Sequence, residues 1–510
     1  MPRKPKAKDG LTAGERVARY EAERAQKQAK ISREDVALEK AETTRDVTPS
    51  MDKKVPRILL KPQHATVRVD FSLDVGRIKP MHGMCNGPVS YGADISELFR
   101  EIGVPSVRFA GTDTAISAFA VDISRIFKNS DADPQNADNY DFSTTDDYVR
   151  AAYDCGASVI FRLGESLDAL KCGKSVLPTD SDRWCEVAVN VIKHYNDYWA
   201  NGFAYGIERF EMLECPSGVS MSERNAIFDL YRKISSVVKL YNDDLKVGGM
   251  CFDDEAVARD FIKFCRKNHC PLDFLTVSSF DSIPTETSER IKKLIPTLKN
   301  LGFGETEIII GSWAYIAKDV DISTNIAKTV MNDPKSSVEK RSKLFSEQSS
   351  IKGAAYALSL MLDLGTVDEV AAAHLYDAQP ALSPWCPICD RFGAPQKTFY
   401  AFKMFGQLYG AGNGVYCESE QTEGYAHSGI YAAAARAADG SACVLISSFE
   451  GCGVVDLRLD SIPSDIYTAD VFILDGVKNF VLGDSVQLMG TKKRLLLNIS
   501  EYGAALVKLY

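Results

Sequence analysis

The sequence predicts a (β/α)8 TIM barrel followed by a C-terminal antiparallel β-sandwich. Residues 76–408 alternate short apolar runs with amphipathic stretches, a pattern typical of βα units and a parallel sheet. Residues 409–510 instead carry short β-rich segments separated by Gly, Asp, Asn and Pro, which is typical of a sandwich. A barrel occupies roughly 250 residues or more as one unit. The 510 residues of the chain therefore accommodate both domains.

Eight βα units are predicted, and eight favour closure of the parallel sheet into a barrel; an open, doubly wound sheet is the alternative. The predicted strands are His82–Cys85, Ser106–Phe109, Ser158–Leu163, Glu208–Leu213, Lys246–Met250, Phe274–Val277, Glu307–Gly311 and Glu369–Ala373. The predicted helices are Thr145–Cys155, Arg183–Ala200, Ser222–Tyr241, Asp254–Asn268, Ser288–Leu301 and Arg341–Asp363.

The segments before the barrel differ from it in composition. Residues 57–75 include the alternating run V-R-V-D-F, which predicts strands that pair with the C-terminal sandwich. Residues 1–56 mix both charge signs and contain one aromatic residue, Tyr20, so they cannot bury a core alone. We interpret them as a disordered or helical tail. The alternative is a docking segment that assembles a homo-oligomer or binds a protein partner.

Charge and composition exclude several classes of function. A formal net charge of -9 argues against nucleic acid as the main partner. No apolar run approaches the roughly 20 residues of a membrane span. The start MPRKPKAKDG lacks the apolar core of a secretory signal, so we expect a cytoplasmic protein. Thirteen cysteines without a disulfide spacing are then expected to be mostly free thiols.

An ordered series of motifs resembles glycoside hydrolase family 39, the β-xylosidase and iduronidase family. VRFAG resembles the second strand of that family, and WCEVAVNVIKHYNDYWANGFAYGIERFEM the helix and strand that deliver its acid/base. KVGG, PLDFLTVSSF, EIIIGSWAY and LYDAQPALSPWCPICDRFGAPQKTFYAF follow in the family's order. The resemblance covers roughly residues 60–500 and implies a barrel with a sandwich, independently of the periodicity.

The resemblance fails at the two catalytic carboxylates. A retaining glycosidase needs an acid/base and a nucleophile about 5–5.5 Å apart. The family acid/base lies in a Trp-Asn-Glu-Pro turn, and Pro216 sets the alignment that puts Cys215 at the glutamate position. The family nucleophile precedes a Trp at the end of strand seven, where Ser312 precedes Trp313. A thiol is a poor general acid and an unassisted serine a weak nucleophile, so neither position is assigned a catalytic role.

Neighbouring sugar-contacting positions are altered as well. Arg108 is retained, but Ala110 and Ser278 stand where the family has histidines. Glu214 replaces the asparagine that holds the sugar's 2-hydroxyl in the family. The replacement of several family residues around one sugar subsite indicates relaxed selection for hydrolysis or a new function of the site.

Replacement groups are considered because barrel chemistry concentrates at the C-terminal ends of the strands. Three carboxylates follow predicted strands and are the candidates for relocated catalysis, namely Glu165, Glu214 and Asp377. Five cysteines fall in similar places and raise the alternative of a thiolate zinc site: Cys85, Cys215, Cys251, Cys386 and Cys389. Ordinary reduced thiols are the favoured interpretation, so we expect no metal and no cofactor.

Four aromatic residues near the strand ends are candidates for a saccharide platform beside Arg108; they are Trp313, Tyr315, Tyr376 and Trp385. The favoured hypothesis is a family 39-like protein that binds a saccharide or glycoconjugate with lost or strongly impaired hydrolysis. The alternatives are an active glycosidase with relocated carboxylates and a non-catalytic structural or partner-binding protein.

Overall fold

The computed structural model describes residues 63–90, 93–110, 121–165, 177–212, 215, 219–318, 334–379, 385–420, 429–451, 453–462, 466, 468–489 and 493–510. The predicted tail over residues 1–56 and the candidate Glu214 lie outside the described residues.

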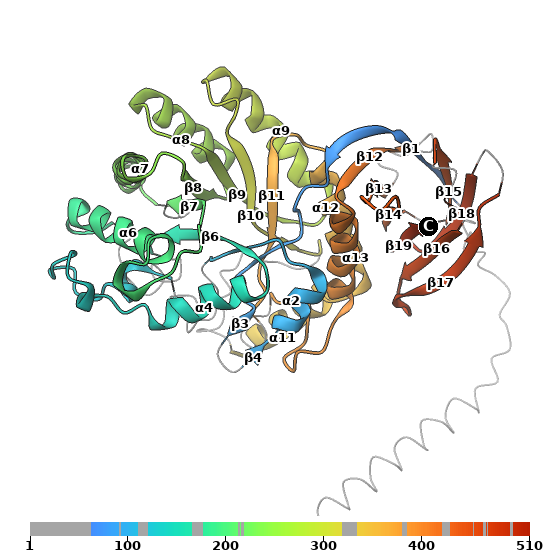
Figure 1. The fold of residues 1–510 in the computed structure, drawn as a ribbon, viewed down its shortest axis with the longest axis horizontal. Helices are drawn as coiled ribbons and strands as arrows, with labels where there is room; N and C mark the ends of the chain where they lie inside the picture. Colours follow the sequence, from blue (N-terminus) through green and yellow to red (C-terminus); the bar gives the residue numbers. More distant parts are fainter. Residues whose placement is uncertain are drawn as a thin grey trace, which may run out of the picture. The chain divides into compact units, whose positions relative to one another are not determined.

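Eight parallel strands close into a barrel, which confirms the predicted fold class and excludes the open sheet (Figure 1). Each strand lies beside the next one along the chain, and β11 closes the ring against β2. The strands are β2 (Gly83–Cys85), β5 (Ser106–Arg108), β6 (Ser158–Leu163), β7 (Arg209–Met212), β8 (Lys246–Phe252), β9 (Phe274–Asp281), β10 (Glu307–Tyr315) and β11 (Val370–Leu375).

Amphipathic helices surround the barrel, and several begin at a polar cap. Asp180 caps α6 by accepting from two backbone N–H groups, and Ser220 and Glu223 form a capping box at α7. The described helices are α2 (Ser96–Ile102), α3 (Ile123–Ile126), α4 (Ser143–Asp154), α6 (Ser181–Asn196), α7 (Met221–Tyr241), α8 (Glu255–Asn268), α9 (Thr285–Asn300), α11 (Pro334–Gln348), α12 (Ile351–Gly365) and α13 (Lys397–Ala411).

The single helix predicted over Arg341–Asp363 is wrong, because the chain forms two helices there. α11 ends at Gln348, and Ser350 starts α12 by accepting from the backbone N–H groups of Lys352 and Gly353. A Cβ on Gly353 would lie 2.1 Å from the carbonyl oxygen of Gln348, so only glycine fits this close turn. The serine cap and the glycine together break the helix.

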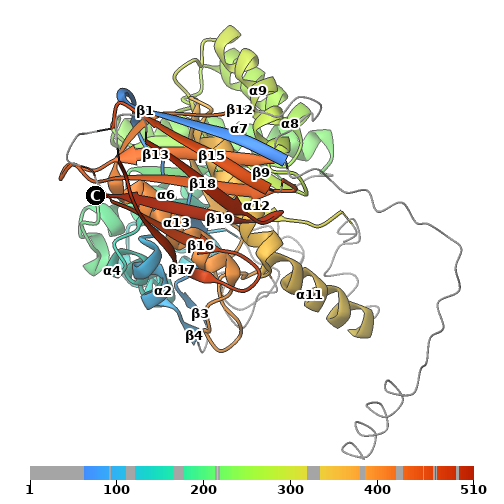
Figure 2. The ribbon, with the colours of Figure 1, turned by 90° about the vertical axis from the view of Figure 1, so that its right-hand side faces the viewer.

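Helix α12 lies between the barrel and the C-terminal sheet (Figure 2). It contacts β10 and β11 of the barrel and β13, β14 and β19 of the sheet, and nearly all of its side chains are buried. A helix that is apolar all round is expected where both faces are covered. Ser359 is a polar exception, and its hydroxyl lies 3.0 Å from that of Ser447 on β14.

The C-terminal part is a nine-stranded, mostly antiparallel sheet that encloses its own apolar core, as the predicted sandwich requires. The N-terminal strand β1 lies inside this sheet, antiparallel to β12 and parallel to β15. The strands are β1 (Gln63–Arg77), β12 (Asn413–Glu420), β13 (Ile430–Arg436), β14 (Ala442–Phe449), β15 (Gly453–Asp460), β16 (Thr468–Leu474), β17 (Asn479–Gln487), β18 (Lys493–Ile499) and β19 (Tyr502–Leu509).

The inside of the barrel changes from apolar to polar along its axis. Ile160, Phe274, Ile309 and Ala372 form a small buried cluster from four different strands. Nearer the C-terminal ends of the strands, the buried side chains include arginines and carboxylates. Active sites of barrel enzymes lie at this end of the barrel.

Candidate functional site

The polar part of the barrel interior centres on an ion pair between β5 and β7. Arg108 Nε donates to Glu211 Oε2 at 2.7 Å, and both side chains are buried. The second oxygen of that carboxylate, Glu211 Oε1, has no hydrogen-bond partner among the described residues. Removing either charge would leave the other uncompensated in a water-poor environment, so the pair fixes the position of Arg108.

Ser312, at the position predicted for the lost nucleophile, lies against the same arginine. Its hydroxyl accepts a hydrogen bond from Arg108 Nη1 at 3.1 Å, and Arg108 Nη1 also lies 3.3 Å from the carbonyl oxygen of Gly311. A Cβ on Gly311 would lie 2.2 Å from Thr276 Cγ2 and 3.1 Å from Arg108 Nε. Because Gly311 has no side chain, the Arg108 guanidinium has room to cross the barrel. At Ser312 it meets a neutral hydroxyl instead of a carboxylate.

Cys85 completes this group from β2. Its thiol donates to the carbonyl oxygen of Gly311 at 2.9 Å and lies 3.5 Å from Ser312 Oγ. Burial raises the pKa of the Cys85 thiol to about 12, more than the nearby charge of Arg108 lowers it. The thiol is therefore protonated at neutral pH and cannot act as a nucleophile or as a base for Ser312.

Cys215, at the position predicted for the lost acid/base, is also buried and joins the main apolar core. Burial raises the pKa of its thiol to about 11; the charge of Arg224 lowers it and that of Asp253 raises it further. A general acid works best with a pKa near the pH of the reaction. A thiol with so high a pKa gives up its proton poorly, in contrast to the carboxylic acid of a glycosidase.

Two of the three candidate replacement carboxylates can be placed. Glu165, after β6, accepts from the backbone N–H of Ser124 at 2.9 Å and from its hydroxyl at 2.6 Å. Burial, and then the charge of Asp122, raise the pKa of Glu165. Asp377, after β11, is fully buried, and its Oδ1 accepts from the backbone N–H of Gln379 at 3.2 Å. The partner of Glu165 thus lies on α3, and that of Asp377 lies in the loop after β11.

The four candidate platform aromatics separate into two groups. Trp313 and Tyr315 face away from the barrel axis: the Trp313 ring stacks on Phe402 of α13, and Tyr315 packs on Tyr356 of α12. Tyr376 and Trp385 lie together, with ring centroids 5.7 Å apart, and both contact Phe280 at the end of β9. The structure therefore brings Tyr376 and Trp385 together at the barrel mouth, with Phe280 as a third member that the sequence did not single out.

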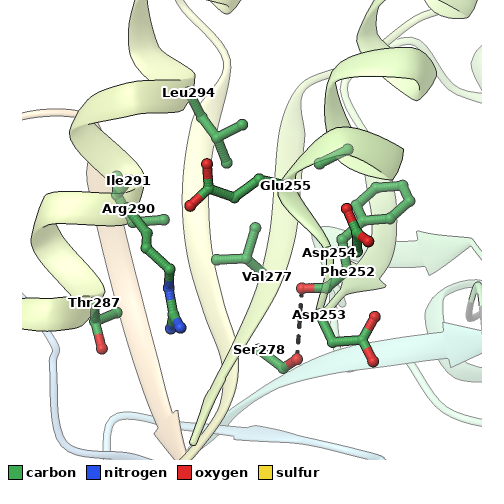
Figure 3. Close-up of a pocket in the computed structure, with 11 residues that line it drawn as sticks. Phe252, Asp253, Asp254, Glu255, Val277, Ser278, Thr287, Arg290, Ile291 and Leu294 are labelled. Carbon is green, nitrogen blue, oxygen red and sulfur yellow. Dashed lines mark hydrogen bonds between the residues drawn. The ribbon is translucent and has the colours of Figure 1, made fainter. Parts of the chain in front are cut away.

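Ser278 and Ala110, at the positions predicted to replace family histidines, have local roles. The Ser278 hydroxyl donates to the carbonyl oxygen of Phe252 at 3.4 Å and lines a small cavity between α8 and α9 (Figure 3). That cavity measures about 30 Å³, enough for one or two waters and too small for a sugar ring. Ala110 donates its backbone N–H to Asn86 Oδ1 at 2.9 Å.

The cysteines considered as metal ligands do not converge. No group of three or more His, Cys, Asp or Glu side chains is placed to hold a metal ion in the part of the chain that the structure describes. Cys386 Sγ and Cys389 Sγ lie 3.9 Å apart, both buried, as a pair. None of the described cysteines is in a disulfide.

Sequence reasoning missed two charged partners in the barrel. Glu211 pairs with Arg108, and Asp122 forms a fully buried 2.6 Å ion pair with Arg162. The sequence contains an indication of both ion pairs. Glu211 and Arg162 each stand inside an apolar strand, where a charged residue needs a partner.

Solved structures share this architecture over most of the chain. A glucosidase from Croceicoccus marinus superimposes with a TM-score of 0.70 at 18% identity, covering 88% of this chain and 99% of that one. A GH39 enzyme from Xanthomonas axonopodis pv. citri gives a TM-score of 0.62 at 13% identity, covering 90% and 99%. A GH39 β-xylosidase from Caulobacter crescentus gives 0.59 at 13% identity, covering 88% and 99%.

Sequence comparison gives a shorter match. A curated β-xylosidase from Geobacillus stearothermophilus is 28% identical over 120 residues, which are 22% of this chain and 23% of that protein. No protein-family model matches the sequence.

The barrel and its sheet thus define a protein with a glycoside hydrolase fold. More particularly, the fold is that of the GH39 enzymes and β-xylosidases, which confirms the resemblance seen in the sequence. None of the helices in the described part of the chain is long and apolar enough to cross a membrane.

Proposed function

We propose that this protein binds a saccharide or glycoconjugate at the barrel mouth and that its glycosidase activity is lost or strongly impaired. The proposal makes it a pseudoenzyme of carbohydrate metabolism, with Arg108, Tyr376 and Trp385 as the groups that contact the sugar. Trp313 and Tyr315 would support the site by packing α12 and α13 against the barrel.

The hydrogen bond from Arg108 to Ser312 carries this proposal. A retaining mechanism needs a carboxylate that attacks the anomeric carbon. At the aligned position the chain has a neutral hydroxyl, 3.1 Å from an arginine whose Nε is paired with Glu211. A serine needs an adjacent base for activation. The protonated Cys85 thiol, 3.5 Å away, cannot supply one.

A second candidate function is an active O-glycosyl hydrolase with relocated carboxylates, and the raised pKa of Glu165 favours it. A buried carboxyl of this kind is suited to general acid work. Under this alternative, Glu165→Gln abolishes hydrolysis of a simple glycoside. Under the proposed function, the wild-type protein hydrolyses simple glycosides little or not at all, so Glu165→Gln changes nothing measurable.

Saccharide binding is tested on a glycan array, followed by calorimetry of the best ligand with wild type and two variants. Arg108→Lys keeps the charge but loses the forked contacts to Glu211 and Ser312, and we expect it to weaken binding about tenfold or more. Arg259→Lys, on the outer helix α8, is the matched control and should bind as wild type does. Absence of binding to every glycan, or equal binding by all three proteins, would refute the assignment of this site.

A further inference from the structure

A second cavity lies beside the barrel mouth, between the segment around α3 and the start of α6. It measures about 300 Å³, and half of the residues that line it are apolar. Six of these form its walls: Ile123, Phe127, Leu177, Pro178, Trp184 and Val187. Small-molecule sites are commonly concave and mostly apolar, with volumes of about 300–1,000 Å³ and a few fixed polar groups.

Two carboxylates line this cavity, Glu165 and Asp180, and of the two only Glu165 is buried. The Glu165 side chain is 8% exposed, and among the described residues its hydrogen bonds come from uncharged groups, the N–H and the hydroxyl of Ser124. Both oxygens are thereby fixed in place, and a carboxylate oxygen can accept more than one hydrogen bond. Ser124 lines the same cavity.

The buried charges near Glu165 do not balance. Arg162 is the neighbouring cation and acts to lower the pKa of Glu165, but its Nη2 lies 2.6 Å from Asp122 Oδ1, so the two carboxylates share this one cation. Among the described residues, Arg162, Asp122 and Glu165 sum to one negative unit of charge. Asp180 and Arg183, which also line the cavity, offset each other. Arg183, at the rim, is directed elsewhere: Nη1 donates to the carbonyl oxygen of Ser130 at 3.2 Å. A buried carboxylate without a counter-charge favours a cationic partner.

We infer that this cavity binds a small organic ammonium with an aromatic or branched aliphatic body. The body fills the space against Trp184 and Phe127, and the ammonium donates hydrogen bonds to Glu165. Hydrogen bonds between an ammonium and a carboxylate are charge-assisted and stronger than neutral ones. The inference does not depend on saccharide binding, since the site and its ligand class are separate from the Arg108 centre.

The test is calorimetry of the full chain with three probes of similar shape: 2-phenylethylammonium, the neutral 2-phenylethanol and the anionic phenylacetate. We expect the ammonium to bind one site per chain with a dissociation constant of about 1 mM or tighter. The alcohol should bind about tenfold or more weakly, because it lacks the charge-assisted contact. Phenylacetate should not bind.

Two variants assign the binding to this cavity. Glu165→Gln removes the charge at nearly constant shape and should weaken ammonium binding about tenfold or more. Val187→Phe fills the cavity from α6 and should weaken the ammonium and the alcohol alike, which keeps the test decisive if Glu165→Gln does not fold. Glu186→Gln is the matched control, because Glu186 is exposed on α6 and does not line the cavity.

Three outcomes would overturn the inference. No ammonium binding at millimolar concentration would exclude the site. Equal affinity for the ammonium and the alcohol would exclude a site selective for cations. Ammonium binding that survives Glu165→Gln or Val187→Phe unchanged would place it elsewhere on the protein. A saccharide that still binds in any of these cases leaves the proposed function standing, so the two proposals fail separately.

Discussion

Arg108 Nε lies 2.7 Å from Glu211 Oε2 inside the barrel, and neither side chain is appreciably exposed to water. The same guanidinium donates to Ser312, so one arginine links the sequence change on β10 to a buried carboxylate on β7. Through this link the barrel holds a buried charged centre in a defined position.

The first prediction concerns the stability of this pair. Arg108→Met leaves the Glu211 carboxylate buried and unpaired, and should lower the free energy of unfolding by about 3–5 kcal/mol. Adding Glu211→Met removes the stranded charge, so the double variant should be more stable than Arg108→Met alone. Thermal unfolding followed by circular dichroism measures both. If the stability loss of the double variant equals the loss in Arg108→Met plus the loss in Glu211→Met alone, the two residues are not coupled.

A second prediction follows from two buried histidines. Burial lowers the pKa of His82 and of His374 to about 3, below the ordinary value of 6.5. The unfolded chain therefore binds more protons than the folded chain between these values, and acid favours unfolding. The stabilisation from the neutral histidines is present above about pH 6.5 and is lost as the pH falls toward 3.

The measurement is the midpoint of thermal unfolding from pH 7 to pH 4. We expect it to fall with pH in wild type and to fall less steeply in His374→Gln, which cannot take up the proton. His269→Gln, at an exposed position on the end of α8, is the control and should follow wild type. An unchanged slope in His374→Gln would contradict the role given to this buried imidazole.

The third prediction separates the two aromatic groups. Trp313→Leu removes the ring that stacks on Phe402, so it should cost about 3–5 kcal/mol of stability and change saccharide affinity little. Trp385→Leu also removes a buried ring and should cost stability, but in addition it should weaken saccharide binding about tenfold. Paired calorimetry and thermal unfolding distinguish them. Loss of affinity in Trp313→Leu with unchanged stability would mean that Trp313 contacts the ligand directly.

The fourth prediction restores the missing carboxylates. Cys215→Glu or Ser312→Glu alone should give almost no hydrolysis, since the two catalytic roles act as a unit. The double variant should hydrolyse aryl β-xylosides weakly, and Glu214→Asn added to it should help further by removing a like charge. A well-folded triple variant no better than wild type, while Asp377→Asn abolishes a native activity, would show that the site was rebuilt elsewhere.

Periodicity predicted the barrel well, because each buried parallel strand is a short apolar run whatever its partners are. The break between α11 and α12 was missed, since the apolar pattern continues across it and only Ser350 and Gly353 mark the turn. Strand β12 (Asn413–Glu420) has a polar, half-exposed pattern, which makes it hard to predict from the sequence.

The site was harder to predict than the fold, because it depends on which way side chains point. Ser312 and Trp313 are neighbours on β10, yet one faces Arg108 inside the barrel and the other packs on α13. Successive residues of a strand face opposite sides. A sequence motif that contains both residues therefore includes only one that faces the site, Ser312. The Arg108–Glu211 contact joins residues 103 positions apart and could be predicted only once the barrel was known.

Turnover of aryl β-xylosides by the purified wild-type protein tests the central claim most directly. With Ser312 and Cys215 in the aligned catalytic positions, we expect a rate below about 0.01 s⁻¹, against about 10 s⁻¹ for a typical enzyme. The same preparation should bind its best saccharide ligand in calorimetry. Turnover above about 1 s⁻¹ that Glu165→Gln or Asp377→Asn abolishes would contradict the account and make the protein an active glycosidase.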